Sequence, residues 1–396
     1  MKLKPLQRSI AAFALCAVLP FGVMAQKKDP VQIGLVTSKS GTFAGQGEEI
    51  ARGIQFAIEE ANAKGGVDGR EVKYQFADDE STPDSGRRVA EKLARDGYNL
   101  LIGAVPSSIS MAFGANLDRW DAAYFVTASK VDAITGKNCN ARMIRTNHSD
   151  AIDLAMIKEW SKSFNDKTYA TIAADYSWGR DSSESFKKAV EASGKTVKLS
   201  LFAPLGTKDF SPYIAQLKEA NVDAIWVAEV GRDAIAFAKQ AQEFGLVPAK
   251  KLIGHSLVVN FIIDGSGTAL ENLIGTATYV PEIDTPRNKA FVAAWRAKFK
   301  RVPTDNEAQG YHGTQVIFEG VKRSGSVKPA DVTKAVRGAT FDTIYGNVTV
   351  RAADNQMVLP TYSGVVKKVD GALRPVLDKA FPASLVPAAS PDCKII

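Results

Sequence analysis

The chain has 396 residues, of which 23% are charged, and a formal net charge of +7. Three basic residues, Lys2, Lys4 and Arg8, lie at the N-terminus, and without them the charge is +4. Basic and acidic residues are otherwise interleaved, as in residues 184–191, which indicates solvated helix faces and excludes a basic stripe for nucleic acid. The length exceeds what one hydrophobic core usually serves and therefore predicts two domains.

The first 25 residues have the three parts of a secretory signal. The basic residues precede an apolar stretch over 10–19, and Val23-Met24-Ala25 fits the small-x-small pattern before a cleavage site. The apolar stretch is shorter than the roughly 20 residues that span a bilayer. We expect cleavage after Ala25 and a periplasmic mature protein. A lipid anchor at Cys16 is the alternative, but Phe13-Ala14-Leu15 places a bulky residue where a small one is usual.

Two cysteines, Cys139 and Cys393, remain in the mature chain. An even number of cysteines in an oxidising compartment predicts a disulfide, with two free buried thiols as the alternative. The bond would attach the C-terminal tail to the first third of the chain as a structural clamp.

Short apolar runs alternate with amphipathic stretches nearly to the end of the chain. The first series has strands at 31–37, 72–76, 99–102 and 124–127, with helices at 48–64 and 84–96 and a further segment at 112–120. A second series has strands at 169–174, 197–202, 224–228 and 251–254, with helices at about 179–193, 210–220 and 232–244. This alternation predicts an α/β fold with two parallel sheets covered by helices.

Helices dominate residues 287–337, and apolar, turn-rich segments follow over 345–369. They contain too few strands for a third domain, so we expect them to complete the two lobes through several short crossings. The predicted first lobe comprises 31–145 and about 281–358, and the second comprises 146–280 and about 359–385. Residues 386–396 form a C-terminal tail.

In open parallel sheets, ligands bind beyond the carboxyl ends of the strands. The loop at 103–108 follows a strand and opens a helix, so Ser107 is either a helix N-cap or a hydroxyl donor to a ligand. Thr127, Ala128, Ser129 and Lys130 follow the next strand in the same way. Lys130 is a candidate partner for a ligand carboxylate, with a solvated lysine as the alternative.

The second series has comparable loops. Tyr176 and Trp178 follow one strand and are candidates to stack on a small ligand or to pack at the hinge. Glu229 and Asp175 are candidates for a ligand ammonium, although solvated or capping carboxylates are commoner. The segment Gly254-His255-Ser256 follows a third strand.

No catalytic, metal or cofactor motif stands out. Ile50 occupies the third small position of a possible dinucleotide fingerprint, and neither a GxxxxGK[ST] loop nor a GxSxG elbow occurs. The three histidines, His148, His255 and His312, form no close pair for zinc. We therefore expect no cofactor, no metal and no enzymatic activity. An enzyme on the same scaffold is a rival hypothesis, because fold alone does not exclude it.

The chain resembles the leucine/isoleucine/valine-binding family of periplasmic proteins. The resemblance begins in VQIGLVTSKSGTFAGQGEEIARGIQFAIEEANAKGG and continues through IGAVPSS, the KDF segment at 208–210 and VDAIWVAE, in the family's order. It covers almost the whole mature chain. It implies a type I periplasmic binding fold with two Rossmann-like lobes, three hinge crossings and a closing cleft.

The resemblance also implies site residues. Ser107 matches the hydroxyl that takes the ligand carboxylate, Ala128 matches a backbone contact to that group, and Lys130 lies near a threonine that completes it. Trp178 matches an aromatic of the second lobe, and Gln46 stands near an aromatic of the first loop. The remaining candidates for ligand binding are Thr127, Ser129, Glu229 and Ser256.

One departure concerns the ammonium group of an amino acid. The family's amino-acid binders place a glutamate where this chain has Gly254-His255-Ser256. Unless Glu229 or Asp175 substitutes, an ammonium would lack its anionic partner in a closed cleft. An aromatic or aliphatic carboxylate without the amine is therefore at least as plausible a ligand as a branched-chain amino acid.

These observations predict a monomeric binding protein that captures a small carboxylate by hinge closure and delivers it to the membrane permease of an ABC importer. The alternative is a periplasmic sensor domain that signals ligand occupancy to a receptor.

Overall fold

The computed structural model describes Met1, residues 28–369 and residues 371–395. Apart from Met1, the predicted signal peptide lies outside the described residues. Among the described helices, none is both long and apolar enough to cross a membrane.

The first sheet has five parallel strands in the order β2-β1-β3-β4-β5. The central strands are apolar and buried on both faces because helices cover them. The strands are β1 (Val31–Thr37), β2 (Val72–Asp78), β3 (Leu100–Gly103), β4 (Ala123–Val126) and β5 (Met143–Arg145).

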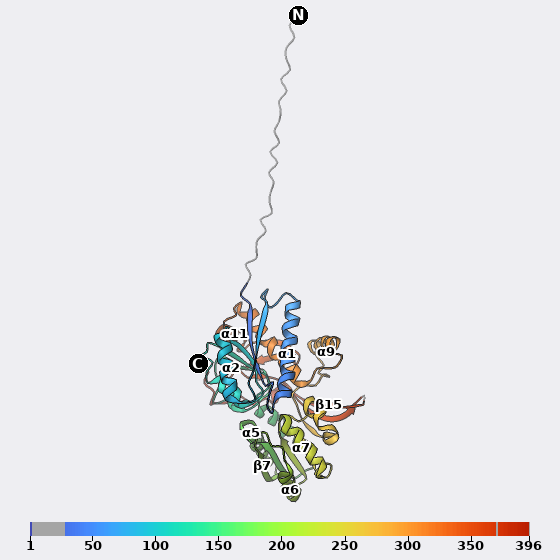
Figure 1. The fold of residues 1–396 in the computed structure, drawn as a ribbon. Helices are drawn as coiled ribbons and strands as arrows, with labels where there is room; N and C mark the ends of the chain where they lie inside the picture. The colour runs from blue at the N-terminus through green and yellow to red at the C-terminus, as the bar shows by residue number, and fades with distance from the viewer. Residues whose placement is uncertain (2–27, 370, 396) are drawn as a thin grey trace.

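Among the described residues, five helices contact this sheet, and a sixth packs on one of them through aromatic rings. Together they form lobe one in the upper part of Figure 1. They are α1 (Ala44–Ala63), α2 (Pro83–Arg95), α3 (Ser107–Gly114), α9 (Pro286–Phe299), α10 (Asp305–Ser324) and α11 (Pro329–Val336). Helix α10 packs closely along α1, where a Cβ at Gly310 would lie 2.3 Å from the carbonyl oxygen of Ile50. Helix α1 begins four residues earlier than the predicted start at 48, so the glycine-rich segment after β1 is partly helical.

The second sheet, the core of lobe two, has seven strands in the order β15-β14-β10-β9-β8-β6-β7. Strands β6 (Thr168–Ala174), β7 (Thr196–Ala203), β8 (Ala224–Ala228), β9 (Lys251–Gly254) and β10 (Ile274–Ala277) pair in parallel. Strands β14 (Thr361–Val369) and β15 (Ala372–Phe381) add an antiparallel edge. The sheet is therefore mixed, whereas the sequence pattern suggested a wholly parallel one. Its helices are α4 (Asp150–Ser161), α5 (Ser177–Glu191), α6 (Ser211–Glu219), α7 (Gly231–Glu243) and α8 (Asn260–Ser266).

The chain passes between the lobes after β5, after β10 and after a small antiparallel sheet. That sheet consists of β11 (Thr340–Thr343), β12 (Gly346–Val350) and β13 (Met357–Val358). Figure 1 shows the two lobes as separate bodies, with α1, α2 and α11 above and α5, α6 and α7 below. The α/β fold with two sheets agrees with the prediction, and the exact lobe boundaries stay a prediction.

The predicted disulfide is present. Cys139 and Cys393, which are 254 residues apart in sequence, are bonded with their Cα atoms 5.6 Å apart. The bond holds the C-terminal tail at Cys393 against the segment of lobe one that contains Cys139.

Candidate functional site

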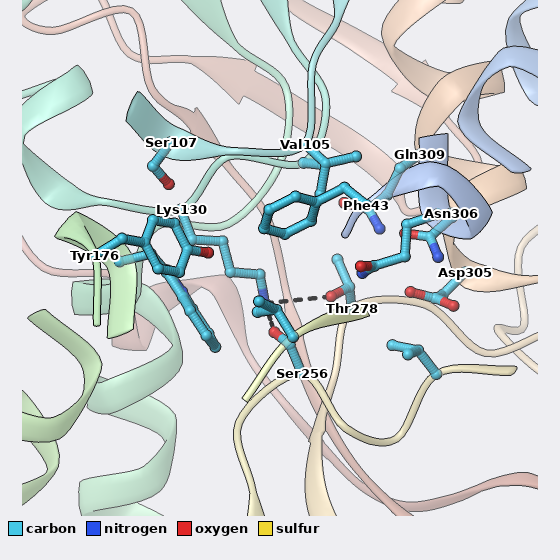
Figure 2. Close-up of a pocket in the computed structure, with 15 residues that line it drawn as sticks. Phe43, Val105, Ser107, Lys130, Tyr176, Ser256, Thr278, Asp305, Asn306 and Gln309 are labelled. Carbon is cyan, nitrogen blue, oxygen red and sulfur yellow. Dashed lines mark hydrogen bonds between the residues drawn. The ribbon is translucent and has the colours of Figure 1, made fainter. Parts of the chain in front are cut away.

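A pocket lies between the lobes, and its walls are loops at the carboxyl ends of strands from both sheets (Figure 2). Lobe one contributes Phe43, Gln46, Val105, Ser107, Ala128 and Lys130, together with Asp305, Asn306 and Gln309 from the start of α10. Lobe two contributes Tyr176, Trp178, Val230, Ser256, Val259 and Thr278. The cavity volume is about 50 Å³. So narrow a site favours a small molecule.

Ser107 is the first residue of α3 and is 1% exposed. Its hydroxyl oxygen accepts a hydrogen bond from the amide of Val131 at 3.4 Å, which leaves the hydroxyl proton free to donate into the pocket. The N-cap of α3 is Pro106, so the alternative role of Ser107 as the cap is wrong. The amides of Ser107 and Ser108 precede the first intrahelical bond and are available to an anion.

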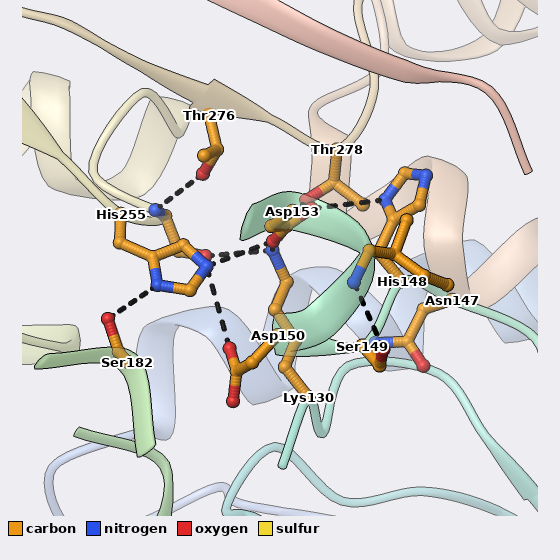
Figure 3. Close-up of polar contacts among 12 residues, drawn as sticks. Lys130, Asn147, His148, Ser149, Asp150, Asp153, Ser182, His255, Thr276 and Thr278 are labelled. Atoms are coloured by element: carbon orange, nitrogen blue, oxygen red, sulfur yellow. Dashed lines mark hydrogen bonds and ion pairs between the residues drawn. The ribbon is translucent and has the colours of Figure 1, made fainter. Parts of the chain in front are cut away.

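Lys130 lines the same pocket, but its ammonium is already paired. It donates to Asp153 at 2.7 Å, to Ser256 at 2.9 Å and to Thr278 at 3.4 Å, as Figures 2 and 3 show. Lys130 follows β4 of lobe one, whereas its three partners belong to lobe two or the crossing after β10. The lysine therefore joins the lobes, and Asp153 neutralises most of the charge that a ligand carboxylate would otherwise use.

Asp153 also receives a buried chain of hydrogen bonds. Trp226 can only donate, so it donates to Ser182, which in turn donates to His255 Nδ1 at 2.7 Å. Neutral His255 then donates from Nε2 to Asp153 at 2.9 Å (Figure 3). Burial lowers the pKa of His255, although Asp153 opposes this effect. Burial would raise the pKa of Asp153, but Lys130 and His255 outweigh burial and hold that pKa below its usual range.

A buried arginine holds the loop that contains Lys130 in place through hydrogen bonds to the backbone. Arg145, the last residue of β5, donates to the carbonyl of Lys130 at 3.1 Å and to that of Val131 at 2.7 Å. It also donates to Gln356 at 2.6 Å and to the Thr135 hydroxyl. Burial lowers the pKa of Arg145 to about 10, so the side chain stays charged at neutral pH. These contacts hold in place both the pocket wall and Val131, whose amide donates to Ser107.

Aromatic side chains close the pocket from the lobe-two side. Trp178 is buried in the first turn of α5, with its ring centroid 6.1 Å from that of Tyr176 and 5.0 Å from that of His255. Its indole Nε1 has no partner among the described residues. Tyr176 meets Phe43 of lobe one edge to face, with centroids 6.2 Å apart. An apolar ligand body would therefore contact rings from both lobes.

The structure brings together six of the nine candidate ligand-binding residues and leaves three outside the pocket. Gln46, Ser107, Ala128, Lys130, Trp178 and Ser256 line it. Thr127 and Ser129 lie behind the wall, where their hydroxyls bond the carbonyls of Gly103 and Val105. Glu229 is 1% exposed, and neither carboxylate oxygen has a partner among the described residues. Burial raises its pKa well above the usual range.

Asp175, the other acid considered for an ammonium, lies outside this pocket in an ion pair with Arg180 at 2.5 Å. His255 is also absent from the wall, while the neighbouring Ser256 lines it.

The start of α10 contributes wall residues that sequence reasoning missed. Thr304 and Glu307 form a capping box, which orients Asp305 and Asn306 in the first turn of α10. Asp305 and Gln309 line the pocket, and burial raises the pKa of Asp305 to about 7. The polar run DNEAQ after the capping Thr304 could have indicated a helix start with polar side chains. It did not show on which lobe this helix packs.

Among the described residues, no group of three or more His, Cys, Asp or Glu side chains is placed to hold a metal ion.

Comparison with known proteins identifies similar proteins over most of the chain. A family model described as periplasmic binding protein matches residues 30–372. The leucine-, isoleucine-, valine-, threonine- and alanine-binding protein of Pseudomonas aeruginosa is 28% identical over 349 residues, covering 87% of this chain and 92% of the relative. The Leu/Ile/Val-binding protein BraC3 of Rhizobium johnstonii is 28% identical over 351 residues, covering 85% and 90%.

Solved structures also match. A solute-binding protein of an ABC transporter from Rhodopseudomonas palustris, in complex with 3,4-dihydroxybenzoic acid, has 25% identity and a TM-score of 0.82, with coverage of 90% of this chain and 98% of that one. An amino acid ABC transporter substrate-binding protein from Pseudomonas fluorescens has 25% identity and a TM-score of 0.80, with coverage of 93% and 100%. The family resemblance drawn from the sequence is thereby confirmed. The chain belongs to the periplasmic binding protein family, whose members are solute-binding proteins of ABC transporters and not enzymes.

Proposed function

We propose that this protein captures a small carboxylate in the periplasm and delivers it to the permease of an ABC importer. The observation on which the proposal rests is that Ser107 and Trp178, from different lobes, line one narrow pocket. The free hydroxyl proton of Ser107 and the first amides of α3 suit a carboxylate. The surrounding aromatic rings suit an apolar body.

A carboxylate with an aromatic body fits these walls better than a branched-chain amino acid. Phe43, Tyr176 and Trp178 provide three ring surfaces. The alternative acids for an α-ammonium, Glu229 and Asp175, do not line the pocket. The relatives support both classes of ligand. One is named for leucine, isoleucine, valine, threonine and alanine, and another was solved with 3,4-dihydroxybenzoic acid.

In the proposed mechanism, the carboxylate first binds lobe one at Ser107, and lobe two then closes with Tyr176 and Trp178. The ligand stabilises the closed form because it contacts both lobes. The closed lobes would present a joint surface to the permease. The predicted signal peptide would direct export to the periplasm, the compartment in which a binding protein captures its ligand.

The test is native mass spectrometry of protein purified from the periplasm, followed by a thermal-shift screen of aromatic acids, aliphatic acids and amino acids. A ligand at about 100 times its Kd should stabilise the protein by about 2.7 kcal/mol and raise Tm by several degrees. Uptake of that ligand by spheroplasts should then require the added protein. If no carboxylate changes Tm or is retained in the mass spectrum, the proposed function is wrong.

A further inference from the structure

Three side chains at one end of the pocket have buried oxygens without a partner among the described residues. These atoms are Gln46 Oε1, Asp305 Oδ1 and Gln309 Oε1. The three residues are 8%, 4% and 5% exposed, and all line the pocket. Buried polar atoms normally have hydrogen-bond partners, so three unpartnered acceptors at one place indicate a partner that the chain itself does not supply.

The arrangement that holds these atoms is fixed by neighbouring ion pairs. Glu307 accepts from Arg52, from Arg301 and from the amide of Thr304, which anchors the first turn of α10. Asp305 and Gln309 are four residues apart and therefore share a face of α10. Gln46 lies in the first turn of α1, the helix that packs along α10. The three acceptors are thus presented by two packed helices.

No positive side chain on the pocket wall is free to satisfy these acceptors. Lys130 is the one basic residue among the described wall residues, and it is bonded to Asp153. A second carboxylate, Glu49, lies beside the first turn of α10 and accepts from Asn306 at 2.7 Å. Burial raises the pKa of Glu49 to about 8, and the neighbouring Asp305 raises it further. This end of the pocket therefore offers oxygen acceptors but no free cation to a ligand carboxylate.

Figure 2 shows Ser107 at the opposite side of the pocket from Asp305, Asn306 and Gln309. A carboxylate at Ser107 directs the other end of the ligand toward these acceptors. We propose that Gln46, Asp305 and Gln309 form an acceptor subsite for a hydrogen-bond donor, a hydroxyl or an ammonium, at the end of the ligand opposite its carboxylate. This inference rests on the proposed function and narrows its ligand class.

The two kinds of donor use the subsite differently. A hydroxyl donates once and also accepts, so a glutamine amide can serve it in either orientation. An ammonium only donates, and it favours the ionised form of Asp305. Replacing Asp305 by asparagine should therefore weaken an ammonium-bearing ligand much more than a hydroxyl-bearing one.

The experiment is isothermal titration calorimetry with matched probes. One set is benzoate, para-hydroxybenzoate and para-(aminomethyl)benzoate, and the other is hexanoate with its ω-hydroxy and ω-amino forms. In at least one set, a donor-bearing member should bind about tenfold or more tightly than the plain acid, because a site built for a donor rejects the analogue that lacks it.

The variants Asp305→Asn and Gln309→Leu test the residues, and Gln315→Leu is the matched control because it lies on α10 outside this pocket. Gln309→Leu should reduce the preference for the donor-bearing probe over the plain acid to less than about threefold, because it removes an acceptor that only the donor-bearing probe can use. Gln315→Leu should keep the wild-type preference. Circular dichroism and Tm establish that each variant is folded.

The outcomes separate this inference from the proposed function. If plain acids bind as tightly as their donor-bearing partners, or if Gln309→Leu keeps the preference, the acceptor subsite is wrong while carboxylate capture stands. Binding of α-amino acids alone also contradicts the subsite, since their donor is adjacent to the carboxylate. If no carboxylate of any class binds, the proposed function fails and the subsite fails with it.

Discussion

Ser107 can bond a carboxylate because its oxygen already accepts from the Val131 amide, which orients the hydroxyl proton away from that amide. Ser107→Ala removes this donor and little packing. We expect the affinity for the carboxylate ligand to fall about tenfold, which corresponds to about 1.4 kcal/mol, with Tm of the ligand-free protein almost unchanged. Calorimetry measures the first quantity and differential scanning calorimetry the second.

Ser108→Ala is the matched control for this variant. Ser108 follows Ser107 in the same helix turn, is only partly buried and does not line the pocket. Its replacement should leave ligand affinity unchanged. Equal affinities for wild type and Ser107→Ala would remove the Ser107 hydroxyl from the site.

Lys130 forms a buried ion pair with Asp153, so its replacement should change the stability of the protein. Lys130→Met would leave the Asp153 carboxylate with only neutral hydrogen-bond donors. Removing one member of a buried ion pair typically costs about 3–5 kcal/mol, so we expect a lower urea midpoint for the ligand-free protein. The double variant Lys130→Met with Asp153→Asn should recover much of that loss, since no buried charge remains uncompensated. A single variant as stable as wild type would contradict this role of the ion pair.

The loops between elements determine how closely the lobes can approach. Gly231, the first residue of α7, has φ of 53° and lies against the β1–α1 loop of lobe one. A Cβ at this position would be 2.3 Å from the backbone carbonyl oxygen of Thr42. The two lobes therefore meet at a point where only glycine leaves enough space.

Gly231→Ala should hinder closure and weaken ligand binding, because the added methyl separates lobe two from the carbonyl of Thr42. Small-angle X-ray scattering should show less compaction on adding ligand than in wild type. Gly245→Ala is the control: Gly245 also has positive φ, 69°, but a Cβ there has no neighbour within 4 Å. In both variants, placing alanine at positive φ destabilises the backbone by roughly 1 kcal/mol. The two variants therefore differ only in the clash of the added methyl group with the Thr42 carbonyl. Equal ligand affinities in the two variants would contradict the contact.

At the scale of the whole molecule, carboxyl groups with raised pKa values make stability depend on pH. Glu49 has its pKa raised to about 8 by burial and by Asp305, with Arg52 opposing the shift. Because its folded pKa exceeds the unfolded value of about 4.5, folding takes up a proton between these values. The stabilising contribution is complete below the unfolded pKa and is lost as pH rises through about 8. The buried histidines have lowered pKa values, so they oppose this trend only below about pH 6.5.

We therefore expect Tm of the ligand-free wild type to fall between pH 6.5 and 8.5. Glu49→Gln should remove part of this fall, on the order of 1–2 kcal/mol of unfolding free energy at pH 8.5. Glu48→Gln, at the neighbouring exposed position on α1, should keep the wild-type slope. Thermal unfolding measured across this pH range checks both variants. Parallel pH profiles for wild type and Glu49→Gln would show that Glu49 does not bind the proton.

Local sequence was sufficient for the eight strands of the two alternating series, for most of their helices, for the disulfide and for the pocket loops that directly follow those strands. Buried parallel strands are continuous apolar runs, and their carboxyl ends point to ligand-binding loops regardless of how the lobes pack. Ser107 and Trp178 could be identified because each follows such a strand directly. The cysteine pair could be identified because only two cysteines remain after the predicted signal.

Tertiary structure alone decided which polar groups are free for a ligand. Lys130 and Asp153 are 23 positions apart, and the sequence does not show that they form an ion pair across the lobes. Asp305 and Gln309 enter the pocket only because α10 returns from the last quarter of the chain to pack on α1. Periodicity is a property of short segments and reports which faces are apolar. Ion pairs such as that of Lys130 with Asp153, and the set of polar groups that line the pocket, depend on contacts between distant segments. These contacts form only when the chain is folded.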